Sequence, residues 1–160
     1  TPGSGNLLFN GGTGLGKTFL SACIAREVAE KGHGVAYESA PRLFAKLEKD
    51  RFASDEESRQ QAEKFLSCDL LILDDLGTEV VNQFTQSTLY YILNTRLNMN
   101  KPTVISTNLT AAQLSERYTG RLFSRLLGVY KPLLFCGKAA YTEAHIRQTP
   151  ASSSAFLSMP

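Results

Sequence analysis

Residues Gly11-Gly12-Thr13-Gly14-Leu15-Gly16-Lys17-Thr18 match the phosphate-binding loop pattern in full. Glycines let a backbone turn with positive φ and bring its N–H groups close around a polyphosphate. The helix predicted to continue from Phe19 adds its free N-terminal N–H groups. Lys17 can then reach the β- and γ-phosphates, and the Thr18 hydroxyl can ligate Mg²⁺. We therefore predict that residues 11–19 bind a nucleoside triphosphate, with Lys17 in a catalytic role and Thr18 as a metal ligand.

Length and composition indicate a single globular domain. The chain has 160 residues, of which 42% are apolar and 20% charged. Its apolar runs fall short of the roughly 20 residues that a membrane span needs, and a net charge of +2 does not by itself favour nucleic acid binding. Cys23, Cys68 and Cys136 are odd in number and lie in apolar contexts, which predicts buried thiols and a cytoplasmic protein.

Both ends of the chain differ from the middle. The sequence begins at Thr1 with no initiator Met and no signal-peptide pattern, and we expect it to be a domain of a longer protein. Residues 139–160 break the pattern of strands and helices, and 149–154 are rich in Ser, Pro and Ala. We predict a flexible tail there and assign it no function.

Apolar runs alternate with helical patterns along the rest of the chain. We expect strands at 7–9, 35–38, 70–73, 103–107 and 132–135. We expect helices at 19–31, 39–50, 55–66, 83–99, 110–117 and 121–127. Capping patterns support two of these helices, Ser54 with Glu57 and Thr110 with Gln113. The alternation predicts a three-layer α/β fold with a mainly parallel central sheet flanked by helices.

Two aspartates follow the apolar strand 70–73. Ligands of parallel sheets bind at the carboxyl ends of the strands. Asp74 is therefore expected to hold Mg²⁺, directly or through water, and Asp75 to polarise the water that attacks the γ-phosphate. The alternative is a strand that simply ends in a polar turn.

Three further polar residues are candidates for the same chemistry. Asn108 follows the strand 103–107, where its amide can orient the attacking water, although Asn is also a good helix N-cap. Arg121 and Arg125 lie four residues apart on one predicted helix and can point toward a neighbouring molecule's nucleotide. A pair of arginines on a helix is also common on a solvated face.

The segments GGTGLGKT, LLILDDLG, VISTNL and RLFSRLL, in this order, resemble the motifs of AAA+ ATPases, which are P-loop NTPases of the ASCE type. More narrowly, they resemble the bacterial helicase loaders and transposition helpers, the DnaC/DnaI/IstB-like proteins. The second helix expected before the LLILDDLG strand is similar to the insertion of initiators and loaders. The resemblance covers about 6–137, and the ATPase domain would be 1–138.

The resemblance implies roles for particular residues. It implies ATP and Mg²⁺ as cofactors, Asn108 as the sensor, and Arg125 as an arginine finger that reaches the ATP of an adjacent subunit. Asp75 stands where many members have Glu, so we expect slow hydrolysis. Arg147 is only a weak match to the sensor arginine that usually follows the last strand.

The resemblance also implies partners. These are ATP and ADP, single-stranded DNA, further copies of the chain, and a replicative helicase held through an N-terminal region absent from this chain; no membrane partner is expected. Four basic residues are either DNA contacts or a solvated helix face: Arg42, Lys46, Lys49 and Arg51.

Four functions fit these observations. We favour the ATPase domain of a DNA replication helicase loader, which hydrolyses ATP slowly in isolation. The alternatives are an IstB-like transposition helper and, in another class, an ATP-gated binding module with negligible turnover. A small-molecule P-loop kinase fits less well, because a sensor Asn with a helix Arg suits a hydrolase and no substrate lid is apparent.

Overall fold

A computed structural model describes residues 5–52 and 56–137. The strands of its central sheet are β1 (Leu7–Gly11), β2 (Val35–Ser39), β3 (Leu70–Leu76), β4 (Thr103–Thr107) and β5 (Lys131–Phe135). The helices are α1 (Lys17–Glu30), α2 (Ala40–Phe52), α3 (Glu56–Ser67), α4 (Gln83–Asn98), α5 (Ala111–Arg117) and α6 (Gly120–Val129).

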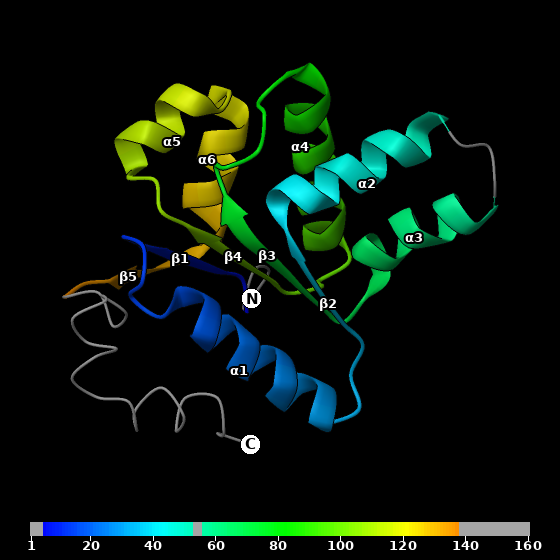
Figure 1. The fold of residues 1–160 in the computed structure, drawn as a ribbon, viewed down its shortest axis with the longest axis horizontal. Coiled ribbons are helices and arrows are strands. Elements are labelled where there is room, and N and C mark those ends of the chain that lie inside the picture. Colours follow the sequence, from blue (N-terminus) through cyan, green and yellow to red (C-terminus); the bar gives the residue numbers. More distant parts are fainter. Residues whose placement is uncertain (1–4, 53–55, 138–160) are drawn as a thin grey trace, which may run out of the picture.

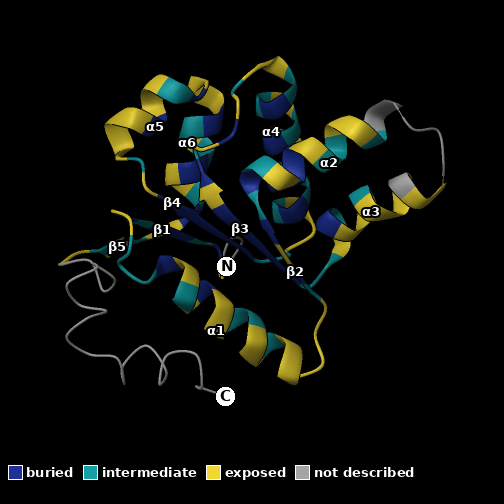
Figure 2. Cartoon of the chain, viewed as in Figure 1, coloured by how far each residue is buried: buried dark blue, intermediate teal, exposed yellow. Residues whose placement is uncertain are grey.

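The sheet is parallel throughout, in the order β2-β3-β4-β1-β5. Helix α1 covers one of its faces, and the other helices lie on the opposite side (Figure 1). Strands β3 and β4 are buried along most of their length (Figure 2), as expected of strands covered on both faces. The predicted three-layer α/β fold is confirmed.

Two apolar clusters hold the layers together. The smaller includes Phe9, Ile72 and Val104 of the sheet, against which Ile24 and Val28 of α1 pack. The larger lies on the other face and joins the sheet to the remaining helices. Its fully buried members include Leu43, Leu71, Leu89, Leu114 and Leu126. Residues alternate between the two clusters along each strand because successive strand side chains point to opposite faces.

Several element ends differ from the expected ones for local reasons. Strand β3 does not stop before the aspartates but runs on to Leu76. Its pairing with β4 shifts register between Leu73 and Leu76, and Asp75 has a φ of 56°. After this bulge the strand pairs with β4 again, and burial of Leu76 in the core stabilises the continued pairing. The expected cap at Ser54 lies outside the described residues, as does the tail.

Helix caps follow the expected chemistry in two places. Thr110 and Gln113 form the predicted reciprocal capping box of α5. Helix α4 has a capping box as well, from Asn82 and Thr85, which the sequence analysis did not identify. Gly32, two residues after the last residue of α1, has a φ of 85°, the left-handed conformation typical of a glycine that follows a helix.

One fully buried arginine connects three elements. Arg96 of α4 is 0% exposed and makes no ion pair with a carboxylate in the described part of the chain. Its guanidinium instead donates to the carbonyl oxygens that end α3, to the one before β4, and to the Thr103 hydroxyl. The acceptors, with distances, are Phe65 O (3.0 Å), Leu66 O (3.1 Å), Cys68 O (3.0 Å), Pro102 O (2.7 Å) and Thr103 Oγ1 (2.9 Å).

The cysteine prediction is wrong. Cys23 and Cys136 are exposed and Cys68 is half-buried. Cys23 lies on the side of α1 that faces solvent, because Ile24 and Val28 set the face of α1 that packs on the sheet. The cytoplasmic location stays a prediction. In the described ranges, every helix is too short or too polar to span a membrane.

Candidate nucleotide-binding site

The phosphate-binding loop joins β1 to α1 at the carboxyl edge of the sheet (Figure 1). Lys17 opens α1, and its ammonium donates to the carbonyl oxygens of Gly11 and Gly12, both at 2.6 Å. Burial lowers the pKa of Lys17, while Asp75 and Asp74 act in the opposite direction. The ammonium is therefore held over the loop by the loop's own backbone.

Only some of the loop glycines have the positive φ that we expected. Gly11, Gly14 and Gly16 do, at 157°, 77° and 96°, but Gly12 does not. A Cβ on Gly11 would lie 2.5 Å from the backbone oxygen of Phe135, so β5 requires this glycine. The loop glycines therefore serve strand packing as well as the approach of phosphate.

Asp74 is the most densely hydrogen-bonded side chain of the site. Its Oδ2 accepts hydrogen bonds from the Thr18 and Tyr37 hydroxyls, each at 3.0 Å. Its Oδ1 accepts from the Ser106 hydroxyl and from the backbone N–H of Asp75, the latter at 3.2 Å. The carboxylate is buried and is held by four donors, which come from α1, β2, β3 and β4. Thr18 and Asp74, both predicted metal ligands, are thus brought together.

Asp75 lies beside Asp74 but faces solvent. Its N–H also donates to Ser106 Oγ at 3.1 Å, and its carbonyl accepts from Thr78. Partial desolvation and the neighbouring Asp74 raise the pKa of Asp75, and Lys17 opposes them. The left-handed backbone at Asp75 lies at the bulge of β3, and it separates this exposed residue from the buried Asp74.

Asn108 reaches the phosphate-binding loop. Strand β4 lies between β3 and β1, so the residue that follows it comes next to the loop that follows β1. The Asn108 amide donates to the Thr13 hydroxyl at 3.2 Å. The segment is held in place by Asn10, whose amide donates to the Leu109 carbonyl at 2.8 Å. The Asn108 amide therefore lies next to the loop, and its role as sensor stays a prediction.

The two arginines of α6 lie against α4. The guanidinium carbons of Arg121 and Arg125 are 5.4 and 5.8 Å from the centroid of the Tyr90 ring, within the range of cation–π attraction. A hydrogen bond with Arg125 and the charges of both arginines lower the pKa of Tyr90. Neither arginine contacts Thr18 or Asp74 in the described structure. Their action on a neighbouring molecule stays a prediction, as does any role of Arg147, which lies outside the described residues.

Two basic residues of α2, Arg42 and Lys46, have an internal partner. Glu38, at the end of β2, is largely buried and forms ion pairs with Lys46 and, at 3.5 Å, with Arg42. This acidic partner explains the positions of two of the four candidate DNA contacts.

The residues present fit a nucleotide with a bound Mg²⁺. Thr18 and Asp74 offer hydroxyl and carboxylate oxygens, the ligand types that Mg²⁺ prefers. Within 5–52 and 56–137, no cluster of three or more His, Cys, Asp or Glu is arranged to hold a metal. Mg²⁺ binds typically through one or two protein oxygens, with phosphate and water completing its shell. The described donors suit that arrangement.

Two contributors to the site were missed by the sequence analysis. Ser106 is a buried polar residue near the carboxyl end of β4, where ligands of parallel sheets bind, and that position was a usable signal. Tyr37 carries no such signal. Its contact with Asp74 depends on β2 pairing with β3, which the strand order decides and the local sequence does not.

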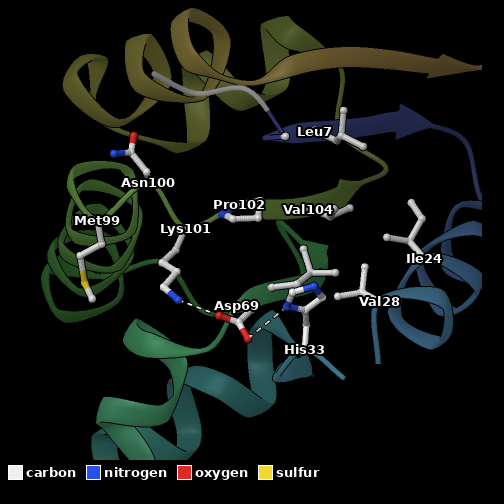
Figure 3. Close-up of a pocket in the computed structure, with 12 residues that line it drawn as sticks. Leu7, Ile24, Val28, His33, Asp69, Met99, Asn100, Lys101, Pro102 and Val104 are labelled. Carbon is white, nitrogen blue, oxygen red and sulfur yellow. Dashed lines mark hydrogen bonds and ion pairs between the residues drawn. The ribbon is translucent and has the colours of Figure 1, made fainter. Parts of the chain in front are cut away.

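A hollow of about 570 Å³ lies at the amino ends of the strands, away from the phosphate-binding loop (Figure 3). Its walls include Leu7, Val28 and Val104, and Asp69 crosses its rim between Lys101, at 2.7 Å, and His33, at 3.8 Å. It includes none of the predicted site residues. The ion pairs join the starts of β3 and β4 to the end of α1 and belong to the scaffold.

Known proteins share both the sequence pattern and the fold. The chain is 25% identical over 122 residues to the replicative helicase loader DnaC of Escherichia coli K12, covering 76% of this chain and 49% of DnaC. It is 31% identical over 111 residues to the putative insertion sequence ATP-binding protein y4pL of Sinorhizobium fredii, covering 69% of this chain and 44% of y4pL. The chain thus spans about half the length of these relatives.

The solved structure of a DnaC helicase loader superposes with a TM-score of 0.72 at 25% identity, covering 85% of this chain and 81% of that one. This likeness identifies the parallel sheet and its helices as an AAA+ fold. Residues 2–125 match the family described as IstB-like ATP binding protein. The phosphate-binding loop, Asp74 and Asn108 all lie within that match, and the chain belongs to the IstB-like ATP-binding protein family.

Proposed function

We propose that this domain hydrolyses ATP with Mg²⁺ and uses the nucleotide to control a step in handling DNA. The observation that supports it best is the 3.0 Å hydrogen bond between Thr18 and Asp74. It joins the phosphate-binding loop to the end of the acidic strand, where a γ-phosphate and its metal would lie. Family membership supports ATP as the nucleotide.

Each polar residue has a task in this proposal. Lys17 and the loop N–H groups hold the phosphates, and Mg²⁺, kept by Thr18 and Asp74, would neutralise charge on the transferring phosphoryl group. Asp75 accepts a proton from the attacking water, and Asn108 orients that water. Asp75 suits the role of base because its side chain is exposed and its raised pKa favours acceptance of a proton.

ATP turnover with and without single-stranded DNA tests the proposal, with nucleotide binding measured in parallel. Asp75→Asn should abolish turnover and leave binding intact. Asp69→Asn is the matched control, because Asp69 lies at the amino ends of the strands, away from the proposed nucleotide site. If the unaltered protein binds ATP but never turns it over, the domain is an ATP-gated binding module instead.

Arg125 completes the site of an adjacent copy in this proposal. Mixing two inactive variants tests it. Arg125→Ala keeps its own aspartates, and Asp75→Asn keeps its arginine, so a mixed assembly contains some complete sites. Turnover should return on mixing at concentrations where the protein assembles. If the mixture stays inactive while each variant assembles, Arg125 does not act between copies.

For the biological step we favour helicase loading, as the likeness to DnaC suggests. The test is ATP-dependent transfer of a hexameric replicative helicase onto single-stranded DNA. The family description and the 31% identity to y4pL favour a second candidate, an ATPase that assists transposition. That role predicts ATP-dependent stimulation of a transposase and no transfer of helicase.

A further inference from the structure

We propose that Tyr37 positions the metal carboxylate: its hydroxyl holds Asp74 in the orientation that binds Mg²⁺ with the nucleotide. The inference rests on the proposed Mg²⁺ and ATP site and adds to it a residue of the edge strand β2. Tyr37 does not contact the phosphate-binding loop in the described hydrogen bonds; it acts through Asp74.

The register of the sheet places Tyr37 beside Asp74. Tyr37 is paired with Ile72 of β3, and Asp74 lies two residues farther along the same strand. Ile72 and Asp74 therefore share a face of the sheet, and a long side chain at Tyr37 can cross diagonally to Asp74. That face is the one that α1 covers, from which Thr18 also reaches Asp74.

The contact is not explained by core packing. Tyr37 is 38% exposed and belongs to neither apolar cluster. Its hydroxyl nevertheless lies 3.0 Å from Asp74 Oδ2. The Tyr37 hydroxyl is the donor in this contact, because a carboxylate oxygen accepts.

Oδ2 of Asp74 accepts hydrogen bonds from two hydroxyls, which lie on different elements of the fold. Thr18 connects the carboxylate to α1, and Tyr37 connects it to β2. If the Tyr37 hydroxyl is removed, Asp74 keeps its donors from Thr18, Ser106 and the Asp75 N–H but loses the described hydrogen bond that connects Oδ2 to β2. Partners that orient a metal ligand in this way typically change metal affinity by about 10–100-fold.

The test measures metal affinity directly, with Mn²⁺ as a paramagnetic substitute for Mg²⁺. Free Mn²⁺ is followed by electron paramagnetic resonance as it is titrated into protein saturated with a non-hydrolysable ATP analogue. Tyr37→Phe should weaken Mn²⁺ binding by about tenfold. Its affinity for the nucleotide in EDTA and its melting temperature should stay unchanged, which separates positioning from a structural role.

Two further variants make the result decisive. Tyr91→Phe removes a hydroxyl from an exposed tyrosine of α4 and should bind Mn²⁺ as the unaltered protein does. Tyr37→Leu should be no better than Tyr37→Phe. The inference is wrong if Tyr37→Phe binds Mn²⁺ normally, or if only Tyr37→Leu is impaired, which would assign the effect to the ring. If the unaltered protein shows no nucleotide-dependent Mn²⁺ binding, the proposed function itself fails.

Discussion

Replacing the buried Arg96 by methionine should destabilise the domain by about 4 kcal/mol. The hydrogen bonds of Arg96 to Phe65 O and to the Thr103 hydroxyl are buried, whereas those to the remaining carbonyls lie nearer the surface, where water can replace the guanidinium. Methionine fills similar space but removes two buried hydrogen bonds from a charged donor, at about 2 kcal/mol each. For a domain of roughly 130 residues, this corresponds to a melting temperature about 15 °C lower.

Urea denaturation followed by circular dichroism measures the effect, with Arg59→Met as the control. Arg59 lies on α3, is exposed, and forms an ion pair with Glu56 at 3.3 Å, so its replacement should change stability by less than about 1 kcal/mol. A loss below about 1 kcal/mol for Arg96→Met would refute the reasoning. It would mean that water or local repacking satisfies the acceptors at no cost.

Two other predictions concern the loop and the arginine helix. Gly11→Ala should lower the melting temperature sharply, because the new Cβ would lie 2.5 Å from a backbone oxygen of β5. Gly12→Ala is the control and should melt normally, because its Cβ would meet a leucine methyl group at 3.9 Å. Equal melting temperatures for the two variants would contradict this prediction. Tyr90 should ionise at lower pH than an ordinary tyrosine, since a hydrogen bond with Arg125 and the positive charges favour the phenolate. Ultraviolet difference titration should lose its earliest tyrosine step in Tyr90→Phe, and an unchanged titration would exclude the effect.

Local patterns were enough to predict the loop and most elements. The glycines, Lys17 and Thr18 lie within a few residues of one another, so their geometry follows from the motif. The meeting of Thr18 with Asp74 followed from one general rule, that ligands bind at the carboxyl ends of parallel strands. Motif and rule together therefore predicted the centre of the site.

The missed features depend on long-range pairing. The contact of Tyr37 with Asp74 requires the edge position of β2, and the bulge at Asp75 reflects the need to bury Leu76 once more. The buried hydrogen bonds of Arg96 leave no local signal in the sequence, because only the packed structure brings the end of α3 to its guanidinium. The exposed Cys23 shows that an apolar neighbourhood in sequence does not decide which side of a helix a residue occupies.

The position of β1 between β4 and β5 has a consequence for how the protein is made. The first strand of the chain pairs with β4 and β5, whose residues lie about a hundred positions later. During synthesis, the phosphate-binding loop therefore leaves the ribosome long before the strands that hold it exist. Such distant pairings also slow folding, because a long loop must close before any contact compensates for the lost entropy. Nucleotide binding should be among the last properties that the nascent domain acquires, and it would report on completion of the sheet.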